Sequence, residues 1–253
     1  SKKLDLFKKR NFLFEVINIS KNFESMEALK KVNLNVNIGE RVALVGPSGS
    51  GKTTLLNLLA GSIRPTNGSI RIFEDNIDAL RKRGDLSRLV GFIHQQFDLV
   101  PHLNVIHNVN AGNLGKWSLG KSLFSLIKPM AKNEAIKALR TVGIDPRLYV
   151  KVSKLSGGEQ QRVAIARVLV QDPKALLADE PVASLDPKRA EKLVELLVRI
   201  SLEDNRVLIA SLHNVDLVKK YFTRVIGLRS GEILFDVPVS ELKQSLLSEL
   251  YEL

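Results

Sequence analysis

Residues 41–54 read RVALVGPSGSGKTT. The first five residues form a compact apolar run of strand length, and the residues from Thr53 to Ala60 are predicted to form a helix. Between the two, residues 46–53 fit the pattern G-x-x-x-x-G-K-[ST], in the strand and helix context that this pattern requires. The stretch therefore predicts a phosphate-binding loop at the end of a buried strand.

The residue types of this loop indicate its chemistry. Its glycines permit backbone conformations that turn several N–H groups inward around phosphate oxygens. Lys52 is expected to reach the β- and γ-phosphates of a nucleotide, and the Thr53 hydroxyl is placed to coordinate Mg²⁺. The alternative is a glycine-rich turn with a surface lysine. The predicted nucleotide-binding residues of the loop are Gly46, Pro47, Ser48, Gly49, Ser50, Gly51, Lys52, Thr53 and Thr54.

A second glycine-containing stretch, residues 155–162, reads LSGGEQQR and opens a run of good helix formers. Unpaired N–H groups at the start of such a helix, together with the helix dipole, make an anion site. The predicted binding residues are Ser156, Gly157, Gly158 and Glu159. The alternative is an ordinary helix start, because Ser156 and Glu159 also fit a capping box. A capping box does not need two glycines in its middle, which favours the anion site.

Two adjacent acids end the apolar run ALLADE at residues 175–180. We expect Asp179 to hold the water shell of Mg²⁺ and Glu180 to polarise a water for attack on a γ-phosphate. Neighbouring side chains on a strand point in opposite directions, which suits two separate tasks. The alternative is an acidic strand end on the surface.

The rest of the chain predicts an α/β fold. Alternating apolar residues over 12–38 favour short antiparallel strands with a turn near Glu24–Glu27. Strands are also predicted at Gly68–Phe73 and Leu89–His94, and then, each after a helix, at residues 175–178, 207–210 and 225–228. Residues 231–235 look like a final hairpin strand, and Ser240–Leu253 like a short amphipathic helix.

These patterns predict one domain over residues 12–240, followed by a C-terminal helix over 241–253. The spacing of apolar residues between about 97 and 157 is helical, so we expect a helical subdomain inserted there. The expected fold class is a P-loop NTPase with an antiparallel β subdomain and this helical insertion.

The composition limits the class of protein. The chain has 253 residues, no cysteine and a net charge of +11, with 38 Lys and Arg against 27 Asp and Glu. Its sequence shows no uncharged apolar run long enough to cross a bilayer and no secretory signal. The basic residues are spread out, with short clusters at 8–10, 81–83 and 219–220 and no aromatic–basic interleaving of the RNA-binding kind. We therefore interpret the positive charge as solvated surface together with proximity to a membrane, in preference to nucleic-acid binding.

The order of the motifs over residues 12–240 resembles the nucleotide-binding subunit of ABC transporters. The resemblance implies that Gln95 senses Mg²⁺ and the transmembrane partner, and that Asp186, in Ser184-Leu185-Asp186, lies at a dimer interface. It also implies that His213 contacts the γ-phosphate and that Phe23 stacks on adenine. Glu180, His213 and Gln95 would be catalytic, and Thr53, Gln95 and Asp179 would hold the metal.

Some of these assignments have alternatives. Gln96 lies beside Gln95, although the spacing to Pro101 favours Gln95. A lone histidine such as His213 is usually structural, and Phe23 could be a core residue. The remaining histidines have no motif support and are expected to be structural; they are His94, His102 and His107.

The resemblance implies an importer ATPase that binds two ATP molecules with Mg²⁺ between two facing copies and hydrolyses ATP to ADP and phosphate. The implied partners are a second copy, transmembrane permease subunits and, through the permease, a solute-binding protein, with no nucleic acid. The implied location is the cytoplasmic face of the membrane, as a peripheral subunit.

A finer resemblance rests on residues 104–128, which resemble a segment of phosphonate-import ATPases. Its basic and apolar side chains suit a contact near the membrane: Lys116, Trp117, Lys121, Phe124 and Lys128. The alternatives are a surface loop without meaning for the solute, an exporter or lipid-extraction ATPase, and a soluble ABC-type ATPase acting on DNA or ribosomes. The last is disfavoured because one cassette is present and no heptad run separates its motifs.

Overall fold

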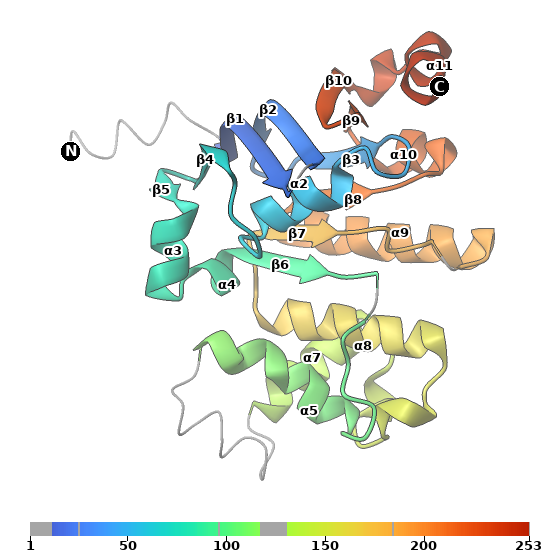
Figure 1. Ribbon diagram of the computed structural model, residues 1–253. Coiled ribbons are helices and arrows are strands. Elements are labelled where there is room, and N and C mark those ends of the chain that lie inside the picture. The colour runs from blue at the N-terminus through green and yellow to red at the C-terminus, as the bar shows by residue number, and fades with distance from the viewer. Residues whose placement is uncertain (1–11, 25, 96, 117–130, 184, 253) are drawn as a thin grey trace, which may run out of the picture.

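The computed structural model describes residues 12–24, 26–95, 97–116, 131–183 and 185–252 (Figure 1). Two sheets lie in separate layers. The smaller sheet has the order β2-β1-β4-β5 and is antiparallel. Its strands are β1 (Phe12–Phe23), β2 (Met26–Asn37), β4 (Asn67–Ile72) and β5 (Asp75–Asn76).

The larger sheet has the order β10-β9-β3-β8-β7-β6. Its strands pair in parallel except for β10, which runs antiparallel to β9. The carboxyl ends of the parallel strands therefore meet at one edge, where ligands bind in open α/β sheets. The strands are β3 (Arg41–Val45), β6 (Val90–Ile93), β7 (Ala175–Ala178), β8 (Val207–Ser211), β9 (Arg224–Arg229) and β10 (Glu232–Pro238).

Alternate residues of the central strands belong to two different cores. In β3, Val42 and Leu44 pack toward the small sheet and helix α2 (Lys52–Leu59), whereas Ala43 and Val45 pack toward the other helices. All four side chains are buried, as expected for a parallel strand covered on both faces. Figure 1 shows α2 between the two sheets and α8 next to β6, the edge strand of the large sheet. The strand before the phosphate loop is thus fixed by packing on both faces.

The main sequence predictions of secondary structure are confirmed. The hairpin at residues 12–38 exists, although its strands are longer than predicted, at 12 residues each. Two short helices, α3 (Ile77–Arg83) and α4 (Leu86–Leu89), were not predicted from the sequence. Each has too few turns to show a clear helical spacing of apolar residues. The Asn76 cap and the left-handed Gly84 that ends α3 were the available signals.

The described residues between 97 and 157 are helical or irregular, apart from an isolated bridge between Asn104 and Lys151. The elements here are α5 (Val105–Asn110), η1 (Ala111–Lys116), α7 (Lys132–Thr141), η2 (Asp145–Arg147) and η3 (Val152–Lys154), and α8 (Gly157–Val170) follows. The predicted contacts of Trp117, Lys121, Phe124 and Lys128 lie outside the described residues.

The C-terminal half supplies the remaining helices: α9 (Pro187–Glu203), α10 (Val215–Tyr221), η4 (Val239–Glu241) and α11 (Gln244–Tyr251). The last helix is therefore shorter than the predicted Ser240–Leu253. The division into an ATPase domain over 12–240, with an inserted helical subdomain, and a C-terminal helix over 241–253 stays a prediction. Among the helices in the described parts of the chain, none is long and apolar enough to cross a membrane.

Candidate functional site

The phosphate loop connects β3 to α2 through backbone that requires glycine. Gly46 and Gly51 have φ angles of 148° and 105°, a region that side-chain-bearing residues rarely adopt. A Cβ on Gly46 would also lie 2.1 Å from the carbonyl oxygen of Leu228. At the loop tip Ser48 and Gly49 are exposed, whereas Ser50 is buried and its carbonyl accepts a hydrogen bond from Gly231 N–H at 3.1 Å. The loop is therefore held in shape by the turn between β9 and β10.

Lys52 lies inside this loop. Its ammonium donates to the carbonyl oxygens of Gly46 at 2.8 Å and Pro47 at 2.9 Å, and only 5% of the residue is exposed. Burial lowers the pKa of Lys52, while the charges of Glu180 and Asp179 act in the opposite direction. These contacts contradict the alternative of a surface lysine. Thr53 is exposed and Thr54 half-buried, both at the start of α2.

Hydrogen bonds connect the phosphate loop to the acidic edge of the sheet. Asp179 Oδ1 accepts from the Thr53 hydroxyl at 3.2 Å and from the Ser211 hydroxyl at 2.8 Å. The Ser211 oxygen in turn accepts from the backbone N–H of Glu180 at 2.7 Å. Ser211 is fully buried at the end of β8. Residues predicted from two separate motifs thus meet beside a serine that the sequence reasoning missed.

The expected alternation of Asp179 and Glu180 along a strand is wrong. β7 ends at Ala178, so both acids lie beyond the strand. Glu180 has a left-handed backbone with φ of 44°, a conformation that costs energy and is concentrated at functional sites. This turn brings Glu180 Oε1 to 2.8 Å from His213 Nε2. Backbone geometry after the strand therefore separates the two acids.

Replacing Ser211 with Ala is expected to lower the free energy of unfolding by about 1–3 kcal/mol, because the N–H of Glu180 loses its acceptor. Urea unfolding measures this loss, and ATP hydrolysis should fall as Glu180 and Asp179 lose their common support. Ser201→Ala is the matched control, since Ser201 is equally buried but donates to Val198 O within α9. Equal hydrolysis rates in the two variants would contradict a positioning role for Ser211.

The second glycine stretch opens α8 with a complete capping box. Ser156 Oγ accepts from the N–H of Glu159, and Glu159 Oε2 accepts from the N–H of Ser156 at 2.9 Å. Yet a Cβ added to Gly157 or Gly158 would meet no atom within 4 Å. Packing within the chain does not require these glycines, so their small size leaves the helix start open to a group from outside. The capping and anion-binding interpretations are therefore compatible.

A buried glutamine joins α8 to the acidic edge. The Nε2 of Gln161 donates to the carbonyl oxygen of Pro181, the residue after Glu180. Sequence reasoning treated Gln161 only as a helix former. The available signal was its position in the first turns of a helix that begins at a predicted anion site, where a side-chain amide that becomes buried needs a hydrogen-bond partner.

The remaining predicted residues occupy exposed positions. Phe23 is 42% exposed at the end of β1, with the ammonium of Lys21 4.8 Å from its ring centre, so it is not a core residue. Gln95 is exposed and follows β6 at the edge where β7 also ends. Asp186 caps α9 by accepting from Arg189 N–H at 3.1 Å. Gln96 and Ser184 lie outside the described residues.

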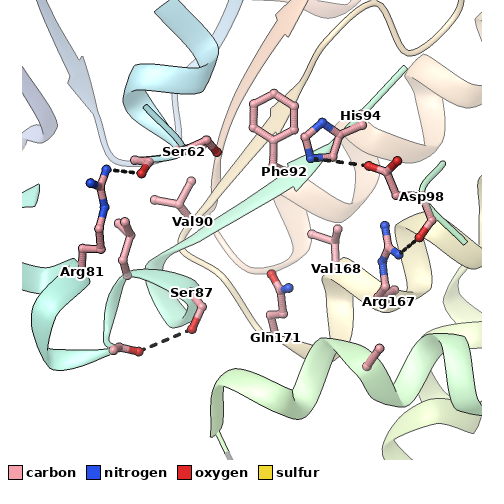
Figure 2. Close-up of a pocket in the computed structure, with 15 residues that line it drawn as sticks. Ser62, Arg81, Ser87, Val90, Phe92, His94, Asp98, Arg167, Val168 and Gln171 are labelled. Atoms are coloured by element: carbon pink, nitrogen blue, oxygen red, sulfur yellow. Dashed lines mark hydrogen bonds and ion pairs between the residues drawn. The ribbon is translucent and has the colours of Figure 1, made fainter. Parts of the chain in front are cut away.

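A groove of about 620 Å³ lies between β6, α3 and α4 on one side and α8 on the other (Figure 2). Arg81, His94 and Arg167 line it together with Phe92 and Val168. His94 was expected to be structural but is exposed here, 4.3 Å from the Phe92 ring centre and 4.0 Å from the Asp98 carboxylate. His102 is exposed and His107 half-buried, both outside the groove.

The groove lies at the far ends of the two helices that begin at the candidate binding motifs. Residues Ala60–Ser62, after the end of α2, line one wall, and Arg167, Val168 and Gln171, near the end of α8, line the other. From their first residues, these helices extend for about 12 Å and about 21 Å respectively. A rigid body seated in the groove would therefore touch the far ends of both helices whose first residues belong to the candidate site.

The fold and site define a P-loop nucleotide-binding protein with a second glycine-rich helix start on a helical insertion. Residues 29–183 match the family model described as ABC transporter. The chain belongs to this family, as the motif order predicted, and the predicted fold class is confirmed. It is an ATP-binding protein and an ATPase of the transport class.

Two similar proteins align with nearly the whole chain. The "Phosphonates import ATP-binding protein PhnC 1" of Nostoc sp. is 45% identical over 94% of this chain and 91% of its own length. The corresponding PhnC protein of Pseudomonas fluorescens is 45% identical over 89% and 86%.

Two solved structures share the fold. The ATP-binding cassette MJ0796, a dimer bound to ADP and Pi in a post-hydrolysis state, matches with TM-score 0.76 and 32% identity, covering 89% of this chain and 98% of its own. The cbiO1 protein of Clostridium perfringens matches with TM-score 0.79 and 29% identity, covering 92% and 90%.

Proposed function

We propose that this protein is the ATP-hydrolysing subunit of an importer for phosphonates or related phosphorus oxyanions. The observation that carries this proposal is the 45% identity, over 94% of the chain, to a phosphonate-import ATP-binding protein. The same description recurs in relatives from Pseudomonas and Oceanobacillus at 42–45% identity. A shared cassette fold alone would not favour one solute over another.

The acidic edge supports the hydrolytic step. Glu180 accepts a hydrogen bond from a water and orients it for in-line attack on the γ-phosphate, while His213 lies 2.8 Å from the Glu180 carboxylate and contacts the developing charge. Lys52 binds the β- and γ-phosphates once its ammonium exchanges the loop carbonyls for phosphate oxygens. Loop N–H groups bind the remaining phosphate oxygens.

The residues around Asp179 fit Mg²⁺. Thr53 Oγ1 and Asp179 Oδ1 are hard oxygen donors 3.2 Å apart, the type of ligand that Mg²⁺ prefers. Gln95, on the adjacent strand end, would add an amide oxygen. The ion would neutralise phosphate charge during the reaction. In this arrangement Ser211 keeps the Asp179 carboxylate aimed at the loop.

We infer that two copies bind two ATP molecules head to tail. Each ATP would lie on the phosphate loop of one copy, with Phe23 against adenine, and beneath Ser156, Gly157 and Gly158 of the other. The open surface around the two glycines supports this, because a phosphate can approach the N–H groups of α8 without a side chain in the way. Glu159 and Asp186 would border the same interface. MJ0796, a relative in fold, is described as a dimer.

The groove in Figure 2 is the proposed docking site of a permease subunit. A partner seated there touches the helix that begins at the phosphate loop and the helix that begins at Ser156. Closure of the phosphate loop and the helix start at Ser156 around ATP would change the distance between the groove walls. ATP binding would then be coupled to the conformation of the permease. The basic character of the chain suits a peripheral position at the cytoplasmic face of the membrane. A solute-binding protein would act through the permease, and no nucleic acid is required.

The identity of the imported solute can be tested by coexpressing this protein with the membrane and binding proteins that are encoded beside it. Uptake and ATPase stimulation are expected with phosphonates or phosphite and not with amino acids or sugars. Stimulation by an amino acid or sugar alone would end the phosphonate assignment, and solute release from the cell would favour an exporter. The separate hydrolytic proposal would survive either outcome.

The same coexpressed complex tests the groove. Ser62→Trp places a large ring at the exposed groove wall and should abolish copurification of the permease. Ser245→Trp, on an exposed face of α11 outside the groove, is the matched control and should copurify normally. Normal copurification of both variants would contradict docking in the groove.

A further inference from the structure

The start of α8 carries a negative charge beside the hydroxyl that is proposed to bind phosphate. Ser156 Oγ donates to Glu159 Oε2 at 2.9 Å, and the same carboxylate oxygen accepts from the Ser156 N–H at 2.9 Å. The hydrogen bond from the Ser156 backbone, then that from its hydroxyl, lowers the pKa of Glu159. Glu159 is therefore ionised at neutral pH.

This charge opposes the proposed role of Ser156 in two ways. A hydroxyl has one proton, so the Ser156 proton that is donated to Glu159 cannot be donated to a phosphate oxygen. A carboxylate this close to a phosphate also repels it, and the repulsion is stronger when water is excluded between two protein surfaces. An unpaired Glu159 would thus weaken the binding of ATP from a second copy.

Arg147 pairs with the other oxygen of the same carboxylate. It ends the short helix η2, and its Nε lies 3.0 Å from Glu159 Oε1. Both side chains keep some contact with solvent, so the pair contributes little to folding stability. Its larger effect is local, because a guanidinium that shares the charge of Glu159 makes Oε2 a weaker acceptor for the Ser156 proton.

The surroundings of Ser156 are otherwise basic. A cavity of about 280 Å³ beside the helix start is lined by Ser156, Gly158 and Glu159 together with Arg162, Arg189 and Lys192. Part of this charge is used elsewhere, since Arg162 donates to Val142 O and Arg189 pairs with Asp186 at 3.2 Å. Neutralising Glu159 leaves a surface that matches an incoming phosphate.

We propose that Arg147 is a positioning residue of the ATP site between two copies: by pairing with Glu159 it offsets the negative charge at the start of α8, so that an incoming γ-phosphate held by the second copy can take the Ser156 proton from Glu159. The proposal rests on the proposed function of Ser156. It adds a residue outside every motif in the sequence and assigns Glu159 a charge that must be neutralised.

Dimerisation in a Glu180→Gln background tests the proposal, because that parent should hold unhydrolysed ATP between two copies. Sedimentation with ATP and Mg²⁺ measures the protein concentration at half-dimerisation. Adding Arg147→Ala should raise this concentration about tenfold, since the carboxylate is left unpaired at a partly exposed site. ATP binding to the monomer, measured by calorimetry, should stay the same.

The decisive variant combines Arg147→Ala with Glu159→Gln. Gln completes the capping box without a charge, so dimerisation should return to within about threefold of the parent. Arg140→Ala is the matched control, because Arg140 pairs with Asp145 at 3.4 Å in the same region without contacting Ser156 or Glu159; its dimerisation should equal that of the parent.

The outcomes separate the two proposals. If the parent forms no ATP-dependent dimer, the proposed shared site is wrong and the role of Arg147 falls with it. If the parent dimerises and Arg147→Ala does so equally well, only the role of Arg147 is overturned. Loss of dimerisation that Glu159→Gln does not restore would mean that Arg147 supports the fold of η2 and not the charge balance of Ser156.

Discussion

Glu180→Gln is expected to lower steady-state ATP hydrolysis by about a thousandfold, within the range for losing a general base. The amide has nearly the shape of the carboxylate and can still bond to His213, but it cannot accept a proton from water. ATP binding should persist because Lys52 and the phosphate loop are unchanged. The bound ATP should then hold two copies together, which light scattering or gel filtration with ATP and Mg²⁺ would detect.

Asp216→Asn is the matched control for this substitution. Asp216 is an exposed acid in the first turn of α10, a few residues beyond His213, and its change to an amide should leave hydrolysis near the wild-type rate. Turnover close to wild type in Glu180→Gln would contradict the assignment of the attacking water to Glu180. Loss of ATP binding would instead indicate that the substitution disturbs Ser211 and the loop.

Ser156→Arg is expected to reduce hydrolysis by at least about a hundredfold, comparable to losing a donor that stabilises developing charge. The long side chain fills the open surface at Gly157 and Gly158 and blocks the approach of a second copy. Nucleotide affinity of the monomer should be retained, because the phosphate loop lies elsewhere in the chain. Calorimetry of nucleotide binding and a phosphate-release assay measure the two properties separately.

Lys52→Ala provides the opposite pattern. Its ammonium contacts phosphate within one chain, so nucleotide binding itself should weaken by roughly ten- to a hundredfold. If Ser156→Arg and Lys52→Ala lost nucleotide affinity to the same extent, the ATP site would lie within one copy. A site shared between copies requires that the two variants differ.

The class of fold and the main motifs of the candidate site were predictable from the sequence alone. The phosphate loop is identifiable in the sequence because the positive φ angles of Gly46 and Gly51 restrict those positions to glycine. The strand β3 is identifiable because burial of both of its faces requires a continuous apolar run. Ser156 and Glu159 also followed from local spacing, since a helix start depends on neighbours within one turn. Local chemistry of this kind can be read along a single stretch of chain.

The contacts between these stretches became visible only in the folded chain. Ser211 connects Asp179 to Glu180 because β7 and β8 are adjacent in the sheet, a pairing between residues 31 and 32 positions apart. The left-handed turn at Glu180, the pairing of Arg147 with Glu159, and the groove between β6 and α8 likewise depend on packing between separate elements. Sequence periodicity reports which face of an element is buried, but it does not report which distant side chain that face will meet.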